Sequence, residues 1–351
     1  MTAHCAGRSI LLNSIAGDDT ITFDTTVFSS PQIINLTGVL PDLSSNIVID
    51  GPGAKLTTSN DTGGNYRIFF VASGAIVTID GLTLANALGS GGAAANSGTL
   101  TINNSTISGN SATFGGGVSN TGTMFIFNST LSGNSASNRG GGVYNAGSGA
   151  LTITNRRTIS GNSASIGGGV ASSGSSALTV TITNSTLADN TATTLADSIH
   201  HSSGTITIQN TIIVGGTCLA TITDGGGNLA YPTACDSISA GGNPMLGALA
   251  DNGGPTLTHL PAFGSAAIDA GDDSICAASP VNNVDQRGVA RPFDGNGDSL
   301  AHCDIGAVEV NTAPPTSTPT STSTPTETGT PTSTATSTST PTATDTYRDA
   351  N

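Results

Sequence analysis

The chain has 351 residues, of which 9% are charged and 4% are aromatic, with 47 glycines and no tryptophan. Soluble domains average about 25% charged residues, so this composition favours flat sheets and tight turns over helices. Nine basic and 23 acidic residues give a formal net charge of −14, which excludes nucleic acid as an expected partner because phosphate backbones are repelled. No apolar run approaches the roughly 18 residues of a membrane span.

Residues 1–20 form an N-terminal segment without a repeat. Met1 is followed by Thr-Ala-His-Cys rather than by the basic and then apolar residues of a secretion signal. Because later features of the sequence indicate export, we expect the N-terminus to be incomplete.

Residues 21–216 consist of short apolar segments that recur with a period in the twenties. The stretch Asn104–Ala112 recurs as Asn128–Ala136, with looser copies at Thr158–Ala164 and Asn184–Ala192. A Gly-Gly-Gly-Val phrase alternates with it at 115–118, 140–143 and 167–170. A period of this length predicts one supersecondary unit stacked on itself.

Each repeat ends a strand at a position occupied only by glycine or asparagine. This turn column comprises Gly51, Gly81, Asn104, Asn128, Asn155, Asn184 and Asn210. Gly and Asn enter the left-handed backbone conformation at least cost, so the column predicts one sharp corner per coil. We also expect its asparagines to hydrogen-bond to one another across coils.

Apolar residues flank the turn column at fixed offsets, with threonine between them. Isoleucine precedes the turn by two positions, as at Ile102 and Ile126, and an apolar residue follows it by three, as at Ile107 and Leu131. This alternation predicts strands with one inward face. Three strands per coil, stacked at about 4.8 Å, predict an all-β, right-handed parallel β-helix. The alternative is an antiparallel sandwich, which would need hairpin turns between strands.

Residues 217–310 break the repeat, and we interpret them as a β cap that covers the last coil. Their cysteines fall into two local pairs, Cys218 with Cys235 and Cys276 with Cys303, and we expect two disulfides that close loops. Buried free thiols are the alternative. Residues 311–351 are rich in Thr, Ser and Pro, which predicts a disordered stalk.

Several phrases resemble known surface proteins. The Gly-Gly-Gly-Val and Ser-Gly-Asn-Ser-Ala repeats resemble those of polymorphic outer-membrane proteins. The stretches 249–259, 267–271 (Ala-Ile-Asp-Ala-Gly), 285–288 (Asp-Gln-Arg-Gly) and 303–309 (Cys-Asp-Ile-Gly-Ala-Val-Glu) look like the C-terminal part of bacterial choice-of-anchor proteins. Those proteins often carry a Cys-Ser-Leu-Arg-Glu-Ala motif, from which the segment beginning at Cys5 departs. The resemblance implies an exported β-helix with a pectin lyase-like fold held at the cell surface.

Few residues suggest chemistry. Asp294, Asn296 and Asp298 alternate as in calcium loops, so they are candidate calcium ligands, with a plain glycine-rich turn as the alternative. We expect the pair His200-His201 to lie in a loop rather than in a catalytic or metal site. Arg157 is expected to be a solvated edge residue. The sequence predicts no catalytic residue and no cofactor other than this calcium ion.

These features together predict a non-catalytic, exported bacterial surface protein that serves adhesion, carbohydrate contact or envelope structure. Its expected partner is an extracellular glycan or protein. The alternative is a carbohydrate-active β-helix enzyme, either a polysaccharide lyase or a glycoside hydrolase, because such enzymes share this fold. Lyases of this kind usually need clustered acidic calcium ligands and a basic residue, and residues 100–216 contain only Asp189 and Asp197 as acids.

Overall fold

The computed structural model describes residues 18–55, 65–147, 150–153, 157–174, 178–219 and 221–312, and the backbone of three further strands at 2–5, 8–11 and 57–61. The chain divides into two units, Met1–Pro314 and Pro315–Asn351. The second unit, and with it the predicted stalk from residue 313 onward, lies outside the described residues. At the N-terminus, β1 (Thr2–Cys5) and β2 (Arg8–Leu11) pair in antiparallel register.

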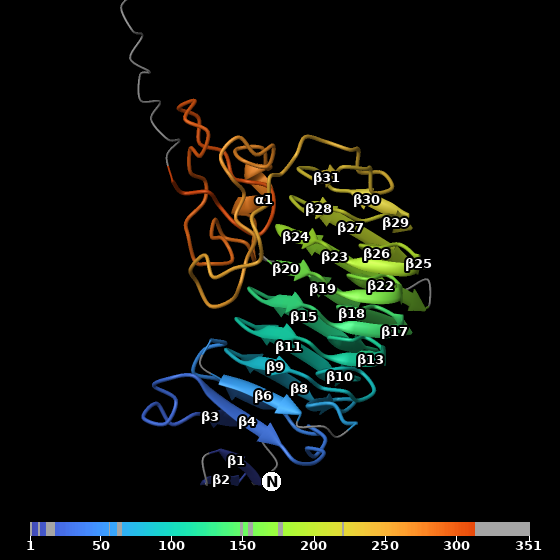
Figure 1. Ribbon diagram of the computed structural model, residues 1–351, viewed down its shortest axis with the longest axis vertical. Helices are drawn as coiled ribbons and strands as arrows, with labels where there is room; N and C mark the ends of the chain where they lie inside the picture. The colour runs from blue at the N-terminus through green and yellow to red at the C-terminus, as the bar shows by residue number, and fades with distance from the viewer. Residues whose placement is uncertain are drawn as a thin grey trace, which may run out of the picture. The chain divides into compact units, whose positions relative to one another are not determined.

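Four parallel sheets form the stack of coils (Figure 1). Sheet 1 contains β3 (Asp19–Thr22), β5 (Ile47–Asp50), β8 (Ile76–Asp80), β11 (Thr99–Asn103), β15 (Thr123–Phe127), β19 (Ala150–Ile153), β23 (Thr179–Thr183), β27 (Thr205–Gln209) and β30 (Ile222–Asp224). Sheet 2 contains β4 (Gln32–Leu36), β6 (Thr57–Asp61), β9 (Thr83–Ala85), β12 (Thr106–Ser108), β16 (Thr130–Ser132), β20 (Arg157–Ser160), β24 (Ser185–Ala188), β28 (Ile212–Val214) and β31 (Leu229–Tyr231).

The two smaller sheets close each coil. Sheet 3 contains β7 (Phe69–Val71), β10 (Ala94–Asn96), β14 (Val118–Asn120), β18 (Val143–Gly147), β22 (Val170–Gly174), β26 (Ile199–His201) and β29 (Cys218–Leu219). Sheet 4 contains β13 (Ser111–Phe114), β17 (Ser135–Arg139), β21 (Ser163–Ile166) and β25 (Thr191–Leu195). The central coils therefore have four strands rather than the three predicted.

Like residues stack in register from coil to coil, which confirms the parallel β-helix and excludes the antiparallel sandwich. In sheet 1, Ile79, Ile102 and Ile126 lie directly above one another and are fully buried. Burying a side chain of this size contributes about 1.5–3 kcal/mol, so the repeated inward column builds one continuous core. The parallel pairing continues to Tyr231, beyond the expected boundary at residue 216.

The turn column adopts the left-handed conformation at all but one of its described positions. The backbone φ angle lies between +42° and +64° at Gly81, Asn104, Asn128, Asn184 and Asn210. Gly51 departs from this description, because its φ is not in the left-handed region. Glycine is required there for space, since a Cβ at Gly51 would lie 2.5 Å from the carbonyl oxygen of Gly81. Asn155 lies outside the described residues.

The asparagine ladder forms at a different column from the one predicted. Asn110, Asn134, Asn162 and Asn190, from the Gly-Asn of the repeat (Asp-Asn in the last copy), are buried, and each Nδ2 donates to the Oδ1 of the next at 2.9–3.0 Å. In the described turn column no such bond joins neighbouring members. Asn128, for example, donates to Asn103 instead, at 3.4 Å.

The C-terminal segment (residues 232–312) begins over the last coil, where Cys235 and Ile238 join the buried core and Ala240 bridges Ala230 of β31, and it then lies along the side of the stack. Figure 1 shows it beside sheet 2. It contains one short helix, α1 (Asp273–Ala277), and isolated bridges. Its contacts reach several coils, since Thr130 donates to the Leu257 carbonyl at 2.5 Å and Thr186 accepts from the Ala307 amide at 3.1 Å.

Gln286 joins this segment to two coils of sheet 2. It is 1% exposed, and its Oε1 accepts from the Thr158 hydroxyl at 3.0 Å. Its Nε2 donates to the hydroxyls of Thr130 and Thr256 at 3.0 and 2.9 Å. His259 forms a similar contact, with Nε2 2.8 Å from the Ser160 hydroxyl. Outward-facing hydroxyls of sheet 2 are thus buried and paired beneath the segment.

We predict that Asn134→Ala lowers the free energy of unfolding by about 2–4 kcal/mol, because it removes the partners of several buried polar groups. The Asn134 Oδ1 accepts from the backbone and side chain of Asn110, and its Nδ2 donates to the Ile107 carbonyl as well as to Asn162. Urea denaturation measures the change. The control is Asn243→Ala, at an exposed turn, with an expected loss under about 1 kcal/mol.

We predict that Gln286→Ala lowers the free energy of unfolding by about 2–3 kcal/mol, because three buried hydroxyls lose a partner. The matched control is Gln32→Ala, whose side chain donates to the exposed Ser30, with an expected change within about 0.5 kcal/mol. Equal losses in the two variants, measured by chemical denaturation, would contradict the role of Gln286 in holding the segment.

Candidate binding face

The outward face of sheet 1 carries a column of threonines, one from almost every coil. The strand register places Thr20, Val48, Thr78, Thr101, Phe125, Thr152, Thr181, Thr207 and Thr223 in one line. We call this line the threonine ladder. It arises because threonine alternates with the buried isoleucines, so every second side chain faces away from the core. Its hydroxyls repeat at the strand spacing of about 4.8 Å.

Two phenylalanine rings lie on the outward face of sheet 1, one of them in the line of the threonine ladder. Phe125 and Phe127, two positions apart on β15, face outward with ring centroids 6.1 Å apart and planes inclined by 10°. Both rings are partly exposed. They form a parallel aromatic surface among hydroxyl-bearing neighbours, which gives the face a flat apolar patch beside hydrogen-bonding groups.

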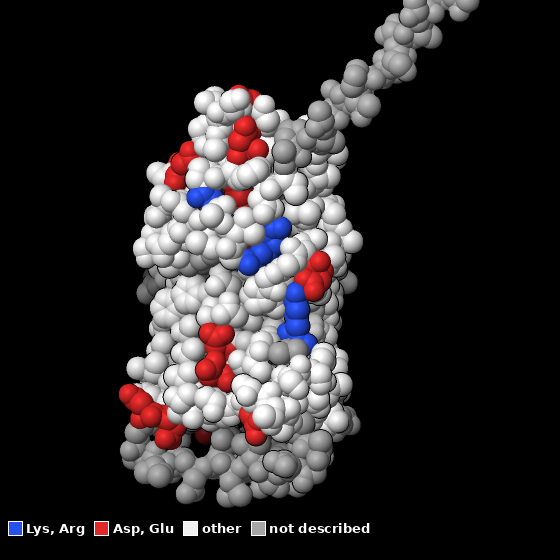
Figure 2. All heavy atoms as spheres, turned by 90° about the vertical axis from the view of Figure 1, so that its left-hand side faces the viewer, with Lys and Arg blue, Asp and Glu red and all other residues white. Residues whose placement is uncertain are grey.

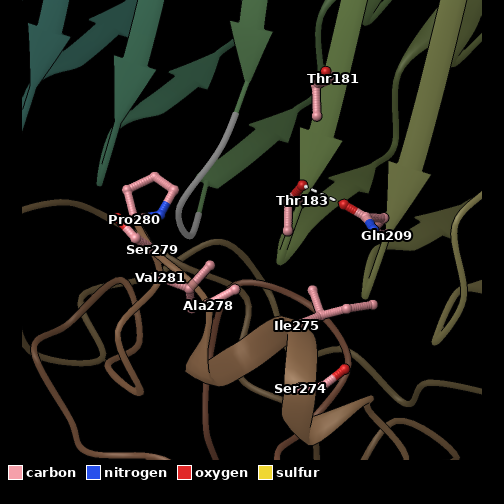
Figure 3. Close-up of a pocket in the computed structure, with 9 residues that line it drawn as sticks. All are labelled: Thr181, Thr183, Gln209, Ser274, Ile275, Ala278, Ser279, Pro280 and Val281. Atoms are coloured by element: carbon pink, nitrogen blue, oxygen red, sulfur yellow. Dashed lines mark hydrogen bonds between the residues drawn. The ribbon is translucent and has the colours of Figure 1, made fainter.

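A cavity of about 420 Å³ lies where the outward face of sheet 1 meets α1 (Figure 3). One side is formed by Thr181, Thr183 and Gln209, and Thr181 is also a member of the ladder. The other side is formed by Ser274 and Ile275 of α1 and by the residues that follow the helix. The Thr183 hydroxyl donates to the Gln209 Oε1 at 3.5 Å. Ladder and cavity therefore share Thr181.

The ladder and the cavity carry no charged side chain, although Asp50 and Asp80 lie on the same outward face near its N-terminal end. The ladder offers hydroxyls that both donate and accept hydrogen bonds, and the phenylalanine pair offers an aromatic plane. None of the residues lining the cavity is charged. On the face drawn in Figure 2, acidic side chains gather in several small groups and basic side chains are fewer. A neutral ligand with many hydroxyl groups and an apolar face matches these groups, whereas an anionic ligand would find no counter-charge.

The candidate calcium residues lie in a tight loop of the C-terminal segment. Asp294 accepts from the amides of Gly297 and Ser299, at 2.7 and 2.9 Å. The Asn296 Oδ1 accepts from the Asp298 amide, and the Asp298 Oδ1 accepts from the Leu300 amide, both at 2.8 Å. These bonds are those of the glycine-rich turn that was the alternative. Within the described ranges, no three His, Cys, Asp or Glu side chains are grouped so as to hold a metal ion. Calcium binding stays a prediction.

His200 and His201 lie in strand β26, not in the loop that the sequence suggested. They are 7% and 6% exposed, and burial lowers the pKa of both rings. Arg157, expected in solvent, is fully buried in β20, one residue before the covered Thr158, and burial lowers its pKa well below the usual value. Both differences have one cause, because strand register and not polarity decides which side chains enter the stack.

The motifs that resemble choice-of-anchor proteins build the interior of the C-terminal segment. Asp285 pairs with Arg287 at 2.8 Å and accepts from the Glu309 amide at 2.9 Å. Arg291 Nε lies 3.6 Å from Glu309 Oε2, and both side chains are fully buried. Burial raises the pKa of Glu309 to about 7 and that of Asp304 to about 6, against the opposing effect of Arg291. These residues hold the segment together.

The two predicted disulfides form. Cys218 bonds to Cys235 and Cys276 bonds to Cys303, across 17 and 27 residues of sequence. The second bond ties α1 to the strand-like stretch that ends the described chain. The Cys276 Sγ also accepts from the side-chain amides of Asn184 and Asn210 at 3.4 and 3.3 Å, so the turn column itself contacts this bond.

Sequence reasoning recognised the outward threonines but did not identify them as a site. The signal that could have revealed them is the recurrence of Thr at the same offset from the turn column in successive coils. The cavity had no such signal, because α1 lies about 90 residues beyond β23 in the chain.

Comparison with known proteins supports the fold alone. A family model described as the right-handed beta helix region matches residues 66–232. The match ends one residue after β31, where the parallel pairing ends. No curated protein and no solved structure matches the chain. The fold is therefore an all-β, right-handed parallel β-helix, and no helix in the described part of the chain is long and apolar enough to cross a membrane.

We predict that the buried carboxyls make stability fall as pH rises from about 4.5 to 7. The folded pKa values of Asp304 and Glu309 lie above their unfolded values, so the folded state binds more protons throughout this window. Their stabilising effect is complete below the unfolded pKa values and is lost as pH rises through the folded ones. Urea denaturation across the window measures this slope.

The control for this slope is Glu309→Gln, because His200 and His201 titrate in the same window with the opposite sign. Their lowered pKa values mean that the unfolded state binds more protons, which favours folding at the higher pH. The variant cannot ionise at position 309, so its stability should fall less than that of the natural chain over the same pH range. Identical slopes would show that Glu309 does not titrate there.

Proposed function

We propose that the protein is a non-catalytic, exported bacterial surface protein that contacts neutral glycans through the outward face of sheet 1. The observation that carries the proposal is the threonine ladder with the Phe125 and Phe127 rings set into it. Saccharides present ring hydroxyls and an apolar C–H face, and this surface offers a partner for each. A periodic surface also suits a periodic polymer.

Charge supports a neutral ligand over an acidic one. The formal net charge of −14 repels uronic acid polymers as it repels nucleic acid. This repulsion arises from the whole surface, and Asp50 and Asp80 add to it on the outward face of sheet 1.

The disulfides support export. Bonds of this kind persist in oxidising compartments and are rare in the cytosol. Both close loops of the unit that the structure describes, Cys218 to Cys235 and Cys276 to Cys303. Closing such loops stabilises a domain by about 3 kcal/mol in the chain-entropy model, which suits a protein outside the reach of chaperones.

The test is retention of the purified full chain on insoluble cellulose, chitin and mannan. We expect retention on at least one of them, reduced roughly tenfold or more in the Phe125→Ala, Phe127→Ala double variant, because each ring contributes about 0.5–1.5 kcal/mol beyond its buried area. The matched control is Phe263→Ala, which removes an exposed phenylalanine from the C-terminal segment.

Two results would overturn the proposal. If the chain is retained on none of the three polymers, the proposal that it contacts neutral glycans is wrong. The second result is release of new reducing or unsaturated ends from a polymer. If this activity is lost when a single acidic residue is replaced, the protein is instead a carbohydrate-active enzyme.

A further inference from the structure

The cavity beside α1 has the composition of a saccharide subsite. Its sheet side contributes the hydroxyls of Thr181 and Thr183 and the amide of Gln209. Its helix side contributes Ser274, whose hydroxyl donates to the Asp272 Oδ1 at 2.6 Å, together with the apolar Ile275 and Val281. In Figure 3 the side chains of Thr183 and Gln209 extend from adjacent strands and lie opposite Ile275. Hydrogen-bonding groups thus face an apolar wall across the space.

The polar groups of the cavity lie on adjacent strands of the stack. Thr183 is 6% exposed, and its hydroxyl lies 3.5 Å from the Gln209 Oε1. β23 and β27 carry these two residues as direct neighbours in the register, Thr183 opposite Gln209. Groups held in place before binding lose little conformational entropy when a ligand arrives.

The helix wall is fixed to the stack by three kinds of contact. Asp272 caps α1 by accepting from the Ser274 amide at 2.9 Å, and its own backbone exchanges two hydrogen bonds with the Asn210 side chain at 2.8 and 3.0 Å. Cys276, within α1, is bonded to Cys303. Asn184 of the turn column donates to the same sulfur. The cavity therefore stays open without a ligand.

The size and the lack of charge of the cavity limit which ligands fit it. Ligand cavities usually span about 300–1,000 Å³, and at about 420 Å³ this one lies near the lower end. Its uncharged lining gives no partner to a phosphate, a carboxylate or an amine. An apolar ligand would leave the hydroxyls of Thr181 and Thr183 without new partners, which costs affinity.

We propose that this cavity binds one neutral pyranose unit of a glycan whose remaining units lie on the threonine ladder. The inference rests on the proposed function and adds a site that selects the sugar. The ladder and the phenylalanine pair supply contact with any neutral polymer, whereas the cavity walls of Gln209 and Ile275 discriminate between hydroxyl configurations. Thr181, common to both, joins the subsite to the ladder.

The test measures binding of four free monosaccharides, glucose, galactose, mannose and N-acetylglucosamine, to the full chain by NMR titration. We expect one of them to bind, with Kd raised about tenfold by Gln209→Ala, the loss of one ligand hydrogen bond. Ala278→Phe, at an exposed position on the cavity rim, should abolish binding by filling the space. Thr205→Val, on the same strand as Gln209 but outside the cavity, is the matched control and should leave Kd unchanged.

The polymer assay separates failure of this site from failure of the proposed function. If the chain is retained on a polysaccharide through Phe125 and Phe127 but binds none of the four sugars, the cavity proposal is wrong and the glycan face stands. Unchanged Kd in both cavity variants would also overturn the cavity proposal. If a sugar binds in the cavity but no polymer is retained, the glycan face is wrong. Thermal melts of each variant show that it is folded.

Discussion

Each coil depends on its neighbours, because parallel strands satisfy their backbone N–H and C=O groups only across the boundary between coils. The buried asparagines extend this dependence to side chains. Asn134 reaches both the coil before it and the coil after it, and all four hydrogen-bonding positions of its amide are used. A coil cannot shift by one residue without breaking this ladder and exposing its isoleucines.

The same constraint explains the shape of the corners. A chain that turns sharply and then resumes a strand needs left-handed residues, and these are supplied by Asn104 and Asn128 at one corner and by Gly109 and Gly133 at another. The glycine triplets act differently. A Cβ at Gly116 would lie 2.3 Å from the Ser135 carbonyl oxygen, so small residues are needed where two backbones approach.

The C-terminal segment decides which faces of the stack remain open. It covers the outward hydroxyls of Thr130 and Thr158 in sheet 2 through Gln286, and it leaves most of the ladder of sheet 1 partly exposed. Where the segment meets sheet 1, α1 forms one side of the cavity. The segment that packs against the stack of coils therefore also shapes the surface on which we propose that glycans bind.

The sequence by itself predicted the β-helix, the left-handed corners and both disulfides. These features are local or recur once per coil, so the periodic positions of Gly, Asn and Ile report them directly. It misplaced the asparagine ladder, because the two asparagines of one repeat have the same propensity for tight turns, and only the stacked backbone decides which one points inward. It also misplaced Arg157 and His201, since register carried polar residues into the interior.

Only the tertiary structure decided which threonines form the candidate site. Thr158 in sheet 2 and Thr152 in sheet 1 both alternate with buried isoleucines, and the sequence pattern does not distinguish them. One is fully buried and the other partly exposed because a non-repeating segment, more than 100 residues later in the chain, packs over Thr158 and not over Thr152. Contacts of that range carry no periodic signal, and so neither the cavity nor the open face could be read from the repeat.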